Sequence, residues 1–258
     1  MTQTKHTIIF AGAGPGDPEL MTIKSMKALG KADLVIYAGS LVPEAVLCWK
    51  GRHTQTVSSA NLTLEDIVGK MITAHLAGKR VVRLHTGDPS LYGAIFEQIR
   101  ELQKKEIPYK VIPGVTAAFA AAASMRMEYT LPEVTQTLIL TRVSGRTPVP
   151  DTEDLEKLAV HRSSMAIYLS IGLAEKVQSI LTTHYGVGAS CAVAYKVSHP
   201  EEKIMYTTVE NLAETCETHG ITRHALIIVG KAVEACQGNT ELIKSKLYDA
   251  DFSHGYRK

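Results

Sequence analysis

The chain has 258 residues, with 28 Lys plus Arg against 26 Asp plus Glu and hence a formal net charge of +2. Hydrophobic residues make up 45% and charged residues 21%, which is typical of a soluble globular protein and excludes a disordered chain, a collagen-like repeat or a coiled coil. The small net charge argues against a broad nucleic-acid-binding surface, although it says nothing about a local basic pocket.

Strand-like and helix-like segments alternate along the first 114 residues. The first strand, at 7–11, runs into a glycine-rich loop at 12–18, and Thr22 is placed to cap a helix that continues to about Leu29. The later segments, in chain order, are a strand at 33–37, a helix at 63–76, a strand at 80–84, a helix at 92–104 and a strand at 109–112. This repeated order predicts a largely parallel sheet covered by helices.

The pattern changes beyond residue 114, where an alanine-rich helix at 116–125 comes first. The predicted strands that follow lie at 137–141, 165–169, 190–195, 203–207 and 225–229, and the predicted helices at 151–158, 173–185 and 208–219. Only a turn at 198–201 separates the strands near 190 and 207, which indicates a hairpin. We therefore predict an α/β protein of two domains, residues 1–113 and 114–258, the second with a mixed sheet.

Three loops rich in Gly or Pro follow predicted strands, at 12–18, 86–90 and 113–117. Ligands of α/β proteins collect at the carboxyl ends of strands, and glycine lets the backbone approach a ligand closely. The first loop does not match the dinucleotide fingerprint, because Pro15 stands where a helix amide would point at a pyrophosphate. Asp33 also opens its strand instead of ending it, and no Walker loop is present. The joint placement of the loops still predicts a ligand site.

Cysteine and histidine spacing gives no sign of a metal site. The four cysteines, Cys48, Cys191, Cys216 and Cys236, lie 20 or more residues apart, which predicts buried or half-buried free thiols in a reducing cytosol. The ten histidines show neither H-x-x-x-H nor H-E-x-x-H spacing. The longest apolar run, 117–123, is far shorter than the roughly 18 residues of a membrane span, and no signal-peptide core precedes it. We expect a cytoplasmic chain with no membrane partner.

The glycine loops carry a resemblance to a known family. Residues 12–22 (Gly-Ala-Gly-Pro-Gly-Asp-Pro-Glu-Leu-Met-Thr), 86–89 (Thr-Gly-Asp-Pro) and 113–117 (Pro-Gly-Val-Thr-Ala) resemble the tetrapyrrole methylases, S-adenosylmethionine-dependent enzymes of sirohaem and cobalamin synthesis. The likeness extends from Ile8 to about Val233. Four further stretches resemble the branch that methylates carbon 11 of precorrin-4 or its cobalt form; they are 37–42, 86–93, 131–137 and 141–148.

This resemblance implies a homodimer of two-domain α/β subunits with a cofactor cleft between the domains. It also implies S-adenosyl-L-methionine as methyl donor and S-adenosyl-L-homocysteine as product. The cofactor-binding residues carried over are Pro15, Thr86, Gly87, Asp88, Leu91, Thr116, Ala117, Leu169 and Ala194. Two residues separate Leu169 from Gly172, where many members carry Met directly before Gly. Thr86 replaces the first glycine of the sirohaem enzyme's Gly-Gly-Asp, which favours the corrin branch.

The implied acceptor carries acetate and propionate groups, which require local Arg or Lys donors. We expect this role of Arg142 and Arg146, and less so of Arg83, Lys50, Arg52 and Arg126. Tyr92 is a candidate to stack on or hydrogen-bond the macrocycle and is the single candidate catalytic residue, although core packing would explain it equally well.

A sulfonium is an excellent leaving group, so the implied transfer needs proximity and alignment and no covalent intermediate. The predicted role of Asp88 is to accept hydrogen bonds from the cofactor or from loop amides, with a simple turn former as the alternative.

Alternative functions remain open at this point. They are methylation of carbon 17 or 20 of a precorrin, of uroporphyrinogen III or of the diphthamide precursor, a non-catalytic tetrapyrrole carrier, and a nicotinamide oxidoreductase. The intact glycine loops argue against the carrier, and the loop spacing argues against the oxidoreductase.

Overall fold

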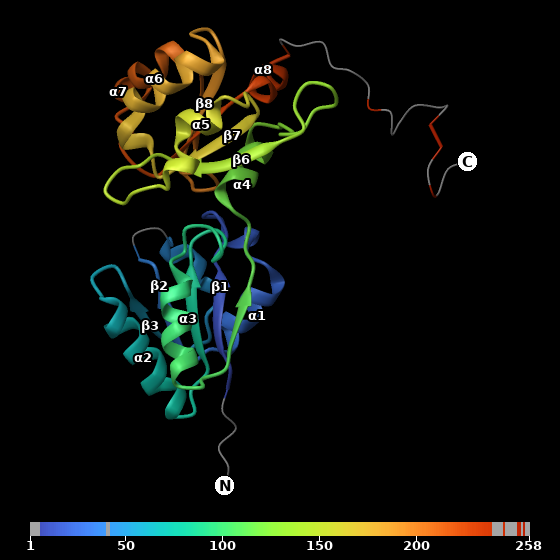
Figure 1. Cartoon of the computed structure of the whole chain (residues 1–258). Coiled ribbons are helices and arrows are strands. Elements are labelled where there is room, and N and C mark those ends of the chain that lie inside the picture. Colours follow the sequence, from blue (N-terminus) through green and yellow to red (C-terminus); the bar gives the residue numbers. More distant parts are fainter. Residues whose placement is uncertain (1–5, 40–41, 239–244, 246–251, 254, 256–258) are drawn as a thin grey trace. The chain divides into compact units, whose positions relative to one another are not determined.

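The computed structural model describes residues 6–39, 42–238, 245, 252–253 and 255, and the statements below refer to these residues (Figure 1). The chain forms two compact units, Met1–Ala120 and Ala121–Lys258, which divide inside the helix α4 (Ala117–Ser124). Each unit holds one five-stranded sheet. The sequence places the boundary earlier, between residues 113 and 114, and the division into these two domains stays a prediction.

The sheet of the first unit is entirely parallel, with the strand order β3-β2-β4-β1-β5. Its strands are β1 (Ile8–Gly12), β2 (Leu34–Tyr37), β3 (Gln55–Ser58), β4 (Val81–His85) and β5 (Tyr109–Ile112). Four of them confirm predicted strands. The prediction missed β3, because this edge strand is short, largely polar and largely exposed and so carries no apolar pattern.

Helices cover both faces of this sheet, as expected for parallel strands. They are α1 (Ile23–Lys31), α2 (Leu64–Leu76) and α3 (Ile95–Lys104), with 3₁₀ turns η1 (Pro18–Leu20) and η2 (Glu44–Trp49). Thr22 caps α1, since its hydroxyl accepts a hydrogen bond from the Ser25 amide at 3.2 Å. The helix predicted from residue 92 begins only at Ile95, because Tyr92 and Ala94 adopt left-handed φ angles of 56° and 47°.

The second unit has the mixed sheet that the sequence predicts, with the order β6-β7-β10-β8-β9. Its strands are β6 (Leu138–Arg142), β7 (Ser164–Tyr168), β8 (Ser190–Tyr195), β9 (Lys203–Thr208) and β10 (Ala225–Val229). The strands β6 and β7 are parallel, and the other pairs are antiparallel, including the predicted β8–β9 hairpin.

The helices of this unit are α5 (Leu155–Ala159), α6 (Ala174–Tyr185), α7 (Leu212–Thr218) and α8 (Lys231–Cys236). Three 3₁₀ turns lie directly before α5, α6 and α7; they are η3 (Asp151–Glu153), η4 (Ile171–Leu173) and η5 (Val209–Asn211). The predicted helices at 151–158 and 208–219 are therefore each a 3₁₀ turn followed by a shorter α-helix. The prediction missed α8.

The cysteines differ in burial more than the sequence suggests. Cys191 and Cys216 belong to the core of the second unit, and burial raises the pKa of the Cys191 thiol to about 12. Cys236 is half-buried, but Cys48 is exposed, which corrects the expectation for that residue. It lies on the 3₁₀ turn η2, whose Val46 and Leu47 supply the buried positions instead.

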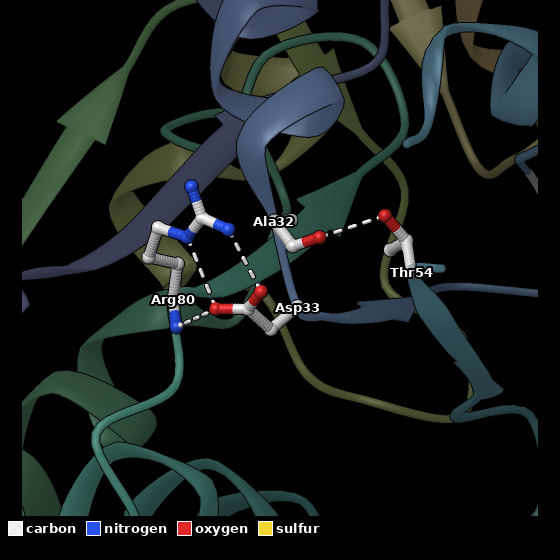
Figure 2. A network of polar contacts seen from close by, with 4 residues as sticks. All are labelled: Ala32, Asp33, Thr54 and Arg80. Carbon is white, nitrogen blue, oxygen red and sulfur yellow. Dashed lines mark hydrogen bonds and ion pairs between the residues drawn. The ribbon is translucent and has the colours of Figure 1, made fainter. Parts of the chain in front are cut away.

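A polar network fastens the amino-terminal edge of the first sheet (Figure 2). The Asp33 carboxylate accepts hydrogen bonds from Arg80 Nε at 3.0 Å, Nη2 at 2.8 Å and the backbone amide at 2.8 Å. Thr54 Oγ1 donates to the Ala32 carbonyl at 2.7 Å. Hydrogen bonds from Arg80 hold the pKa of Asp33 well below its usual range. Asp33 is therefore engaged at the sheet edge opposite the glycine loops, which is inconsistent with a nucleotide-binding acid at the end of its strand.

Candidate functional site

The three glycine loops meet at the carboxyl edge of the first sheet, because β1 lies between β4 and β5. The Ala13 amide donates to the His85 carbonyl at 2.7 Å. Gly14 and Gly87 then exchange backbone hydrogen bonds, of 2.8 Å from the Gly87 amide and 3.3 Å from the Gly14 amide. The first two loops are thus held together beyond the end of the parallel β1–β4 pair, by an antiparallel bridge between Gly14 and Gly87.

Three glycines bring the loop backbones into direct contact. A Cβ added to Gly114 would lie 2.1 Å from the Gly87 carbonyl oxygen, and one added to Gly12 would lie 2.6 Å from Gly114 Cα. Gly87 also has a left-handed φ of 58°. No side chain fits at Gly12 or Gly114 unless the backbone moves, so the sequence of the loops is dictated by this contact.

Asp88 joins the second loop to the third. Its Oδ2 accepts a hydrogen bond from the Gly114 amide at 2.8 Å, while its Oδ1 accepts from the Ser90 amide at 2.8 Å and from the Ser90 hydroxyl. Partial burial opposes ionisation of Asp88, but the hydrogen bonds from Ser90 and Gly114 outweigh it and keep the pKa below its ordinary value. Both carboxylate oxygens of Asp88 thus accept hydrogen bonds from loop amides. The sequence analysis predicts bonds of this kind, or bonds from the cofactor.

Six of the nine predicted cofactor residues lie on these three loops, and a seventh, Leu91, directly follows the second loop. Pro15, Gly87 and Thr116 are buried, whereas Thr86, Asp88, Leu91 and Ala117 are half-buried. The Thr116 carbonyl accepts hydrogen bonds from the Phe119 and Ala120 amides at 3.1 and 3.2 Å, so Thr116 starts the first turn of α4. A small set of backbone and short side-chain atoms is therefore presented at one sheet edge.

Arg83, one of the weaker substrate candidates, is buried and serves the scaffold. Its Nη1 donates to the Ile36 carbonyl and its Nε to Gln98 Oε1, both at 3.2 Å. Gln98 Nε2 donates in turn to the Ala94 carbonyl at 3.2 Å. Arg83 thereby links β4 to the end of β2 and, through Gln98, to the turn that contains Tyr92. The Tyr92 residue itself is 43% exposed. Burial lowers the pKa of Arg83 to about 10.

His85, the last residue of β4, is 4% exposed and stacks on Phe10 with ring centroids 6.1 Å apart. Burial, reinforced by the charge of Arg83, lowers the pKa of His85 to about 3. The unfolded chain binds a proton here below its ordinary pKa of 6.5, and the folded chain does not, so the free energy of unfolding decreases as the pH falls from about 6.5 toward 3.

We expect His85→Phe to remove most of this pH dependence. In the parent chain, His85 accounts for a loss of about 2 kcal/mol in the free energy of unfolding between pH 7.5 and pH 5. Urea denaturation at the two pH values measures it, with exposed His53→Gln as the control that keeps the parental slope. A His85→Phe slope equal to the parental one would contradict the neutral buried state of His85.

Four more predicted residues, Arg142, Arg146, Leu169 and Ala194, lie at or near the ends of β6, β7 and β8 in the second sheet. The weaker candidates lie elsewhere: Lys50 and Arg52 follow η2 in the first unit, and Arg126 follows α4. Arg142 ends β6 and donates to the Thr147 carbonyl at 3.1 Å and the Pro148 carbonyl at 2.6 Å, so its guanidinium holds its own loop. Arg146 is exposed on that loop. Leu169 follows β7 with a φ of 52° and is 66% exposed, whereas Ala194 is 1% exposed within β8.

Several contacts of this arrangement cannot be predicted from the sequence. Gly12 and Gly114 lie in two of the predicted loops, but a single sequence does not show that their backbones are in contact. Ser90 was detectable, because Asp88-Pro-Ser90 has the spacing at which an Asp side chain bonds the amide two residues on. Ser170 is buried, donates to the Tyr168 carbonyl at 2.6 Å and accepts from the Val143 amide at 2.8 Å, and so ties the ends of β6 and β7 together.

Residues 7–213 match the family model of the tetrapyrrole (corrin/porphyrin) methylases. The chain therefore belongs to this family and is an enzyme of the methyltransferase class. It is 49% identical over 252 residues to the cobalt-precorrin-4 C(11)-methyltransferase of Methanocaldococcus jannaschii, covering 97% of this chain and 96% of that protein. It is 44% identical to the precorrin-4 C(11)-methyltransferase of Pseudomonas aeruginosa, covering 97% and 98%.

Solved structures support the same fold. A cobalt-precorrin-4 methyltransferase of cobalamin biosynthesis matches with a TM-score of 0.87 and 41% identity, covering 90% of this chain and 98% of the other. The uroporphyrin-III C-methyltransferase of Thermus thermophilus in complex with S-adenosylhomocysteine matches with a TM-score of 0.71 and 26% identity, covering 89% and 94%.

The described part of the chain offers neither a membrane-crossing helix nor a cluster of metal-binding side chains. None of its helices has the length and apolar character that crossing a bilayer requires. Nor do three or more His, Cys, Asp or Glu side chains gather there in a way that suits a metal ion.

Proposed function

We propose that this chain transfers the methyl group of S-adenosylmethionine to carbon 11 of cobalt-precorrin-4 or precorrin-4, in cobalamin biosynthesis. The observation that carries the proposal is the 49% identity to a cobalt-precorrin-4 C(11)-methyltransferase across 97% of the chain. The four subfamily stretches at 37–42, 86–93, 131–137 and 141–148 belong to the same sequence likeness and resemble the same branch of the family.

The donor is proposed to bind at the three loops of the first unit. The contact among Gly12, Gly87 and Gly114 leaves an edge formed by backbone rather than side chains, which suits a ligand that the backbone must approach closely. The complex of a family neighbour with S-adenosylhomocysteine supports a donor of this kind. Leu169 and Ala194 stay predictions for the same ligand.

The proposed reaction moves one methyl group. The carbon–sulfur bond of the sulfonium breaks with its electron pair left on sulfur, and an electron pair of the macrocycle forms the new carbon–carbon bond. The chain's own part is to hold the donor in a fixed loop edge, to orient the acceptor and to exclude water, which strengthens electrostatic attraction at the site. Preorganisation by the Asp88 bonds to Ser90 and Gly114 serves the first of these tasks.

A panel of acceptors tests the proposed specificity. Purified protein is incubated with S-adenosylmethionine and, separately, cobalt-precorrin-4, precorrin-4 and uroporphyrinogen III, and the products are weighed by mass spectrometry. We expect one added methyl group on a precorrin-4 form and none on uroporphyrinogen III. The comparison of cobalt-containing with metal-free precorrin-4 also decides between the substrates after which the two relatives are named. Methylation of uroporphyrinogen III alone would instead support the alternative function of a uroporphyrinogen III methyltransferase.

Arg146 is proposed to hold a carboxylate of the acceptor, because its side chain is exposed on the loop after β6. We expect Arg146→Ala to raise the KM for the acceptor about two- to fivefold, the range for an exposed ion pair, with unchanged affinity for S-adenosylhomocysteine. Arg142→Ala is expected to raise KM as well and also to loosen the 143–148 loop, since Thr147 and Pro148 lose their donor. Parental KM values in both variants would place the acceptor carboxylates elsewhere.

The homodimer and the cytoplasmic location are likewise proposals. The homodimer rests on the family resemblance, and the cytoplasmic location rests on the cysteine spacing and the short apolar runs. Light scattering of the purified protein measures the mass in solution, for which we expect twice the chain's 28.1 kDa. A monomer that is fully active would contradict the dimer.

A further inference from the structure

At one edge of the second sheet, three strands end and two strands begin. The register pairs Arg142 with Tyr168 and Ala225 with Tyr195, so the ends of β6, β7 and β8 lie level with the starts of β10 and β9. Four non-glycine residues with left-handed φ angles lie at this edge; they are Leu169, Lys196, Ser198 and His224. Such backbone conformations are energetically costly and recur at functional sites.

Basic side chains converge where β8 ends and β10 begins. Lys196 and His199 lie on the β8–β9 turn, and Arg223 and His224 lie directly before β10. The Lys196 amide donates to the His224 carbonyl at 2.9 Å, which fastens the two segments together. We call Lys196, His199, Arg223 and His224 the basic corner. Burial, then Arg223, Lys196 and His199, lower the pKa of His224, so the corner has a positive field.

The corner already binds carboxylates of its own turn. Lys196 Nζ pairs with Glu201 Oε1 at 2.9 Å, and the Ser198 amide donates to Glu202 Oε2 at 2.5 Å. The Glu201 side chain is 59% exposed, so its pair with Lys196 is of the weak, solvent-exposed kind. Within the described residues no carboxylate pairs with Arg223, which is exposed. The basic corner therefore offers the guanidinium of Arg223, which has no carboxylate partner among the described residues, and the ammonium of Lys196. A ligand carboxylate could replace Glu201 at Lys196.

We propose that the basic corner is a binding subsite for carboxylate groups of the tetrapyrrole acceptor, with Arg223 as the donor that has no internal carboxylate partner in the described part of the chain and Glu201 as an internal competitor for Lys196. The inference rests on the proposed function for the identity of the ligand. The β6 end, with Arg142 and Arg146, lies three strand spacings from β8, or about 14 Å away along the same edge. A macrocycle with carboxylates around its rim has such widely separated anionic groups, and two basic positions orient it better than one.

Two variants with opposite expected effects test this subsite. Arg223→Gln removes the free cation and is expected to raise the KM for cobalt-precorrin-4 about two- to fivefold, whereas Arg223→Lys keeps the charge and stays near the parental KM. Glu201→Gln releases Lys196 from its competitor and is expected to lower KM. Arg162→Gln is the matched control, because Arg162 is an exposed arginine before β7, at the opposite edge of the same sheet. General damage to the fold would not improve acceptor binding in Glu201→Gln.

Binding of uroporphyrin, followed by fluorescence at fixed ionic strength, supplies a readout that needs no methyl transfer. We expect weaker binding by Arg223→Gln and tighter binding by Glu201→Gln, with unchanged calorimetric affinity for S-adenosylhomocysteine in both. Parental KM and parental porphyrin affinity in Arg223→Gln and Glu201→Gln would overturn the subsite. A parent protein that binds the porphyrin in this pattern but methylates no precorrin-4 would keep the carboxylate subsite and contradict the proposed function.

Discussion

Gly114→Ala is expected to abolish measurable binding of S-adenosylhomocysteine while leaving a folded protein of reduced stability. The new Cβ would lie 2.1 Å from the Gly87 carbonyl oxygen and 2.9 Å from Gly12 Cα. Both neighbours are backbone, so no side chain can rotate away and at least one loop must move. Overpacking of this kind costs about 1–3 kcal/mol of stability, and the displaced loops are those proposed to hold the cofactor.

Calorimetric titration with S-adenosylhomocysteine measures the affinity, and urea denaturation measures the stability. Gly69→Ala is the matched control, because Gly69 lies within α2 and a Cβ there meets no atom within 4 Å. Alanine in a helix interior is favoured over glycine by about 0.5–1 kcal/mol, so this variant is expected to be at least as stable as the parent and to keep its affinity. A Gly114→Ala protein with parental affinity would show that the contact of the three loops is irrelevant to the cofactor.

Asp88→Asn is expected to weaken S-adenosylhomocysteine binding by about tenfold or more. Each oxygen of Asp88 accepts from an amide, so either orientation of the Asn side chain turns its NH₂ group toward an N–H donor, at Ser90 or at Gly114. An unsatisfied donor of this kind costs about 1–3 kcal/mol. When the NH₂ group faces Gly114, the bond between the second and third loops is lost as well.

Asp66→Asn separates this effect from general destabilisation. Asp66 Oδ2 accepts from the Thr63 amide at 3.2 Å in the capping box of α2, so its replacement lowers stability without touching the loops. If Asp88→Asn lost stability as Asp66→Asn does but kept parental affinity, Asp88 would be a turn former only. Since the folded-state pKa of Asp88 is lowered, its contribution is present above the ordinary carboxyl pKa of 3.8 and is lost as pH falls through the folded-state value. The difference between parent and variant is therefore expected to be constant from pH 6 to pH 8.

Most of the fold was predictable because the buried strands are short apolar runs that stand out in the sequence. Ile8–Gly12 and Ala225–Val229 are apolar runs bounded by glycine, and Thr22 and Thr63 precede apolar helical stripes with their hydroxyls in capping position. The edge strand β3 was not predicted, because neither of its faces is buried enough to require apolar residues. The late start of α3 escaped because Tyr92 and Ala94 are ordinary helix residues in composition, and their left-handed φ angles are imposed by the turn.

The site was predictable as a set of loops but not as a set of contacts. Glycine at 12, 87 and 114 follows from strand ends and motif, whereas the mutual approach of these backbones depends on β1 lying between β4 and β5, an order that the sequence does not state. Arg83 illustrates the reverse error. As a charged residue beside a motif it looks like a ligand donor, yet its place in the central strand β4 buries it against Gln98 and Ile36. The basic corner was not predicted because its two halves, Lys196 with His199 and Arg223 with His224, are more than 20 residues apart in the chain. They are brought together by the Tyr195–Ala225 pair and the hydrogen bond from the Lys196 amide to the His224 carbonyl.

The most direct test of the central claim is the position of the transferred methyl group. The parent protein is given S-adenosylmethionine labelled with carbon-13 in the methyl group together with cobalt-precorrin-4 or precorrin-4, and the product is examined by NMR while S-adenosylhomocysteine is quantified. We predict one labelled methyl on carbon 11 and one S-adenosylhomocysteine for each product molecule. A labelled methyl on any other carbon, or tetrapyrrole binding without transfer of label to either acceptor, would contradict the account.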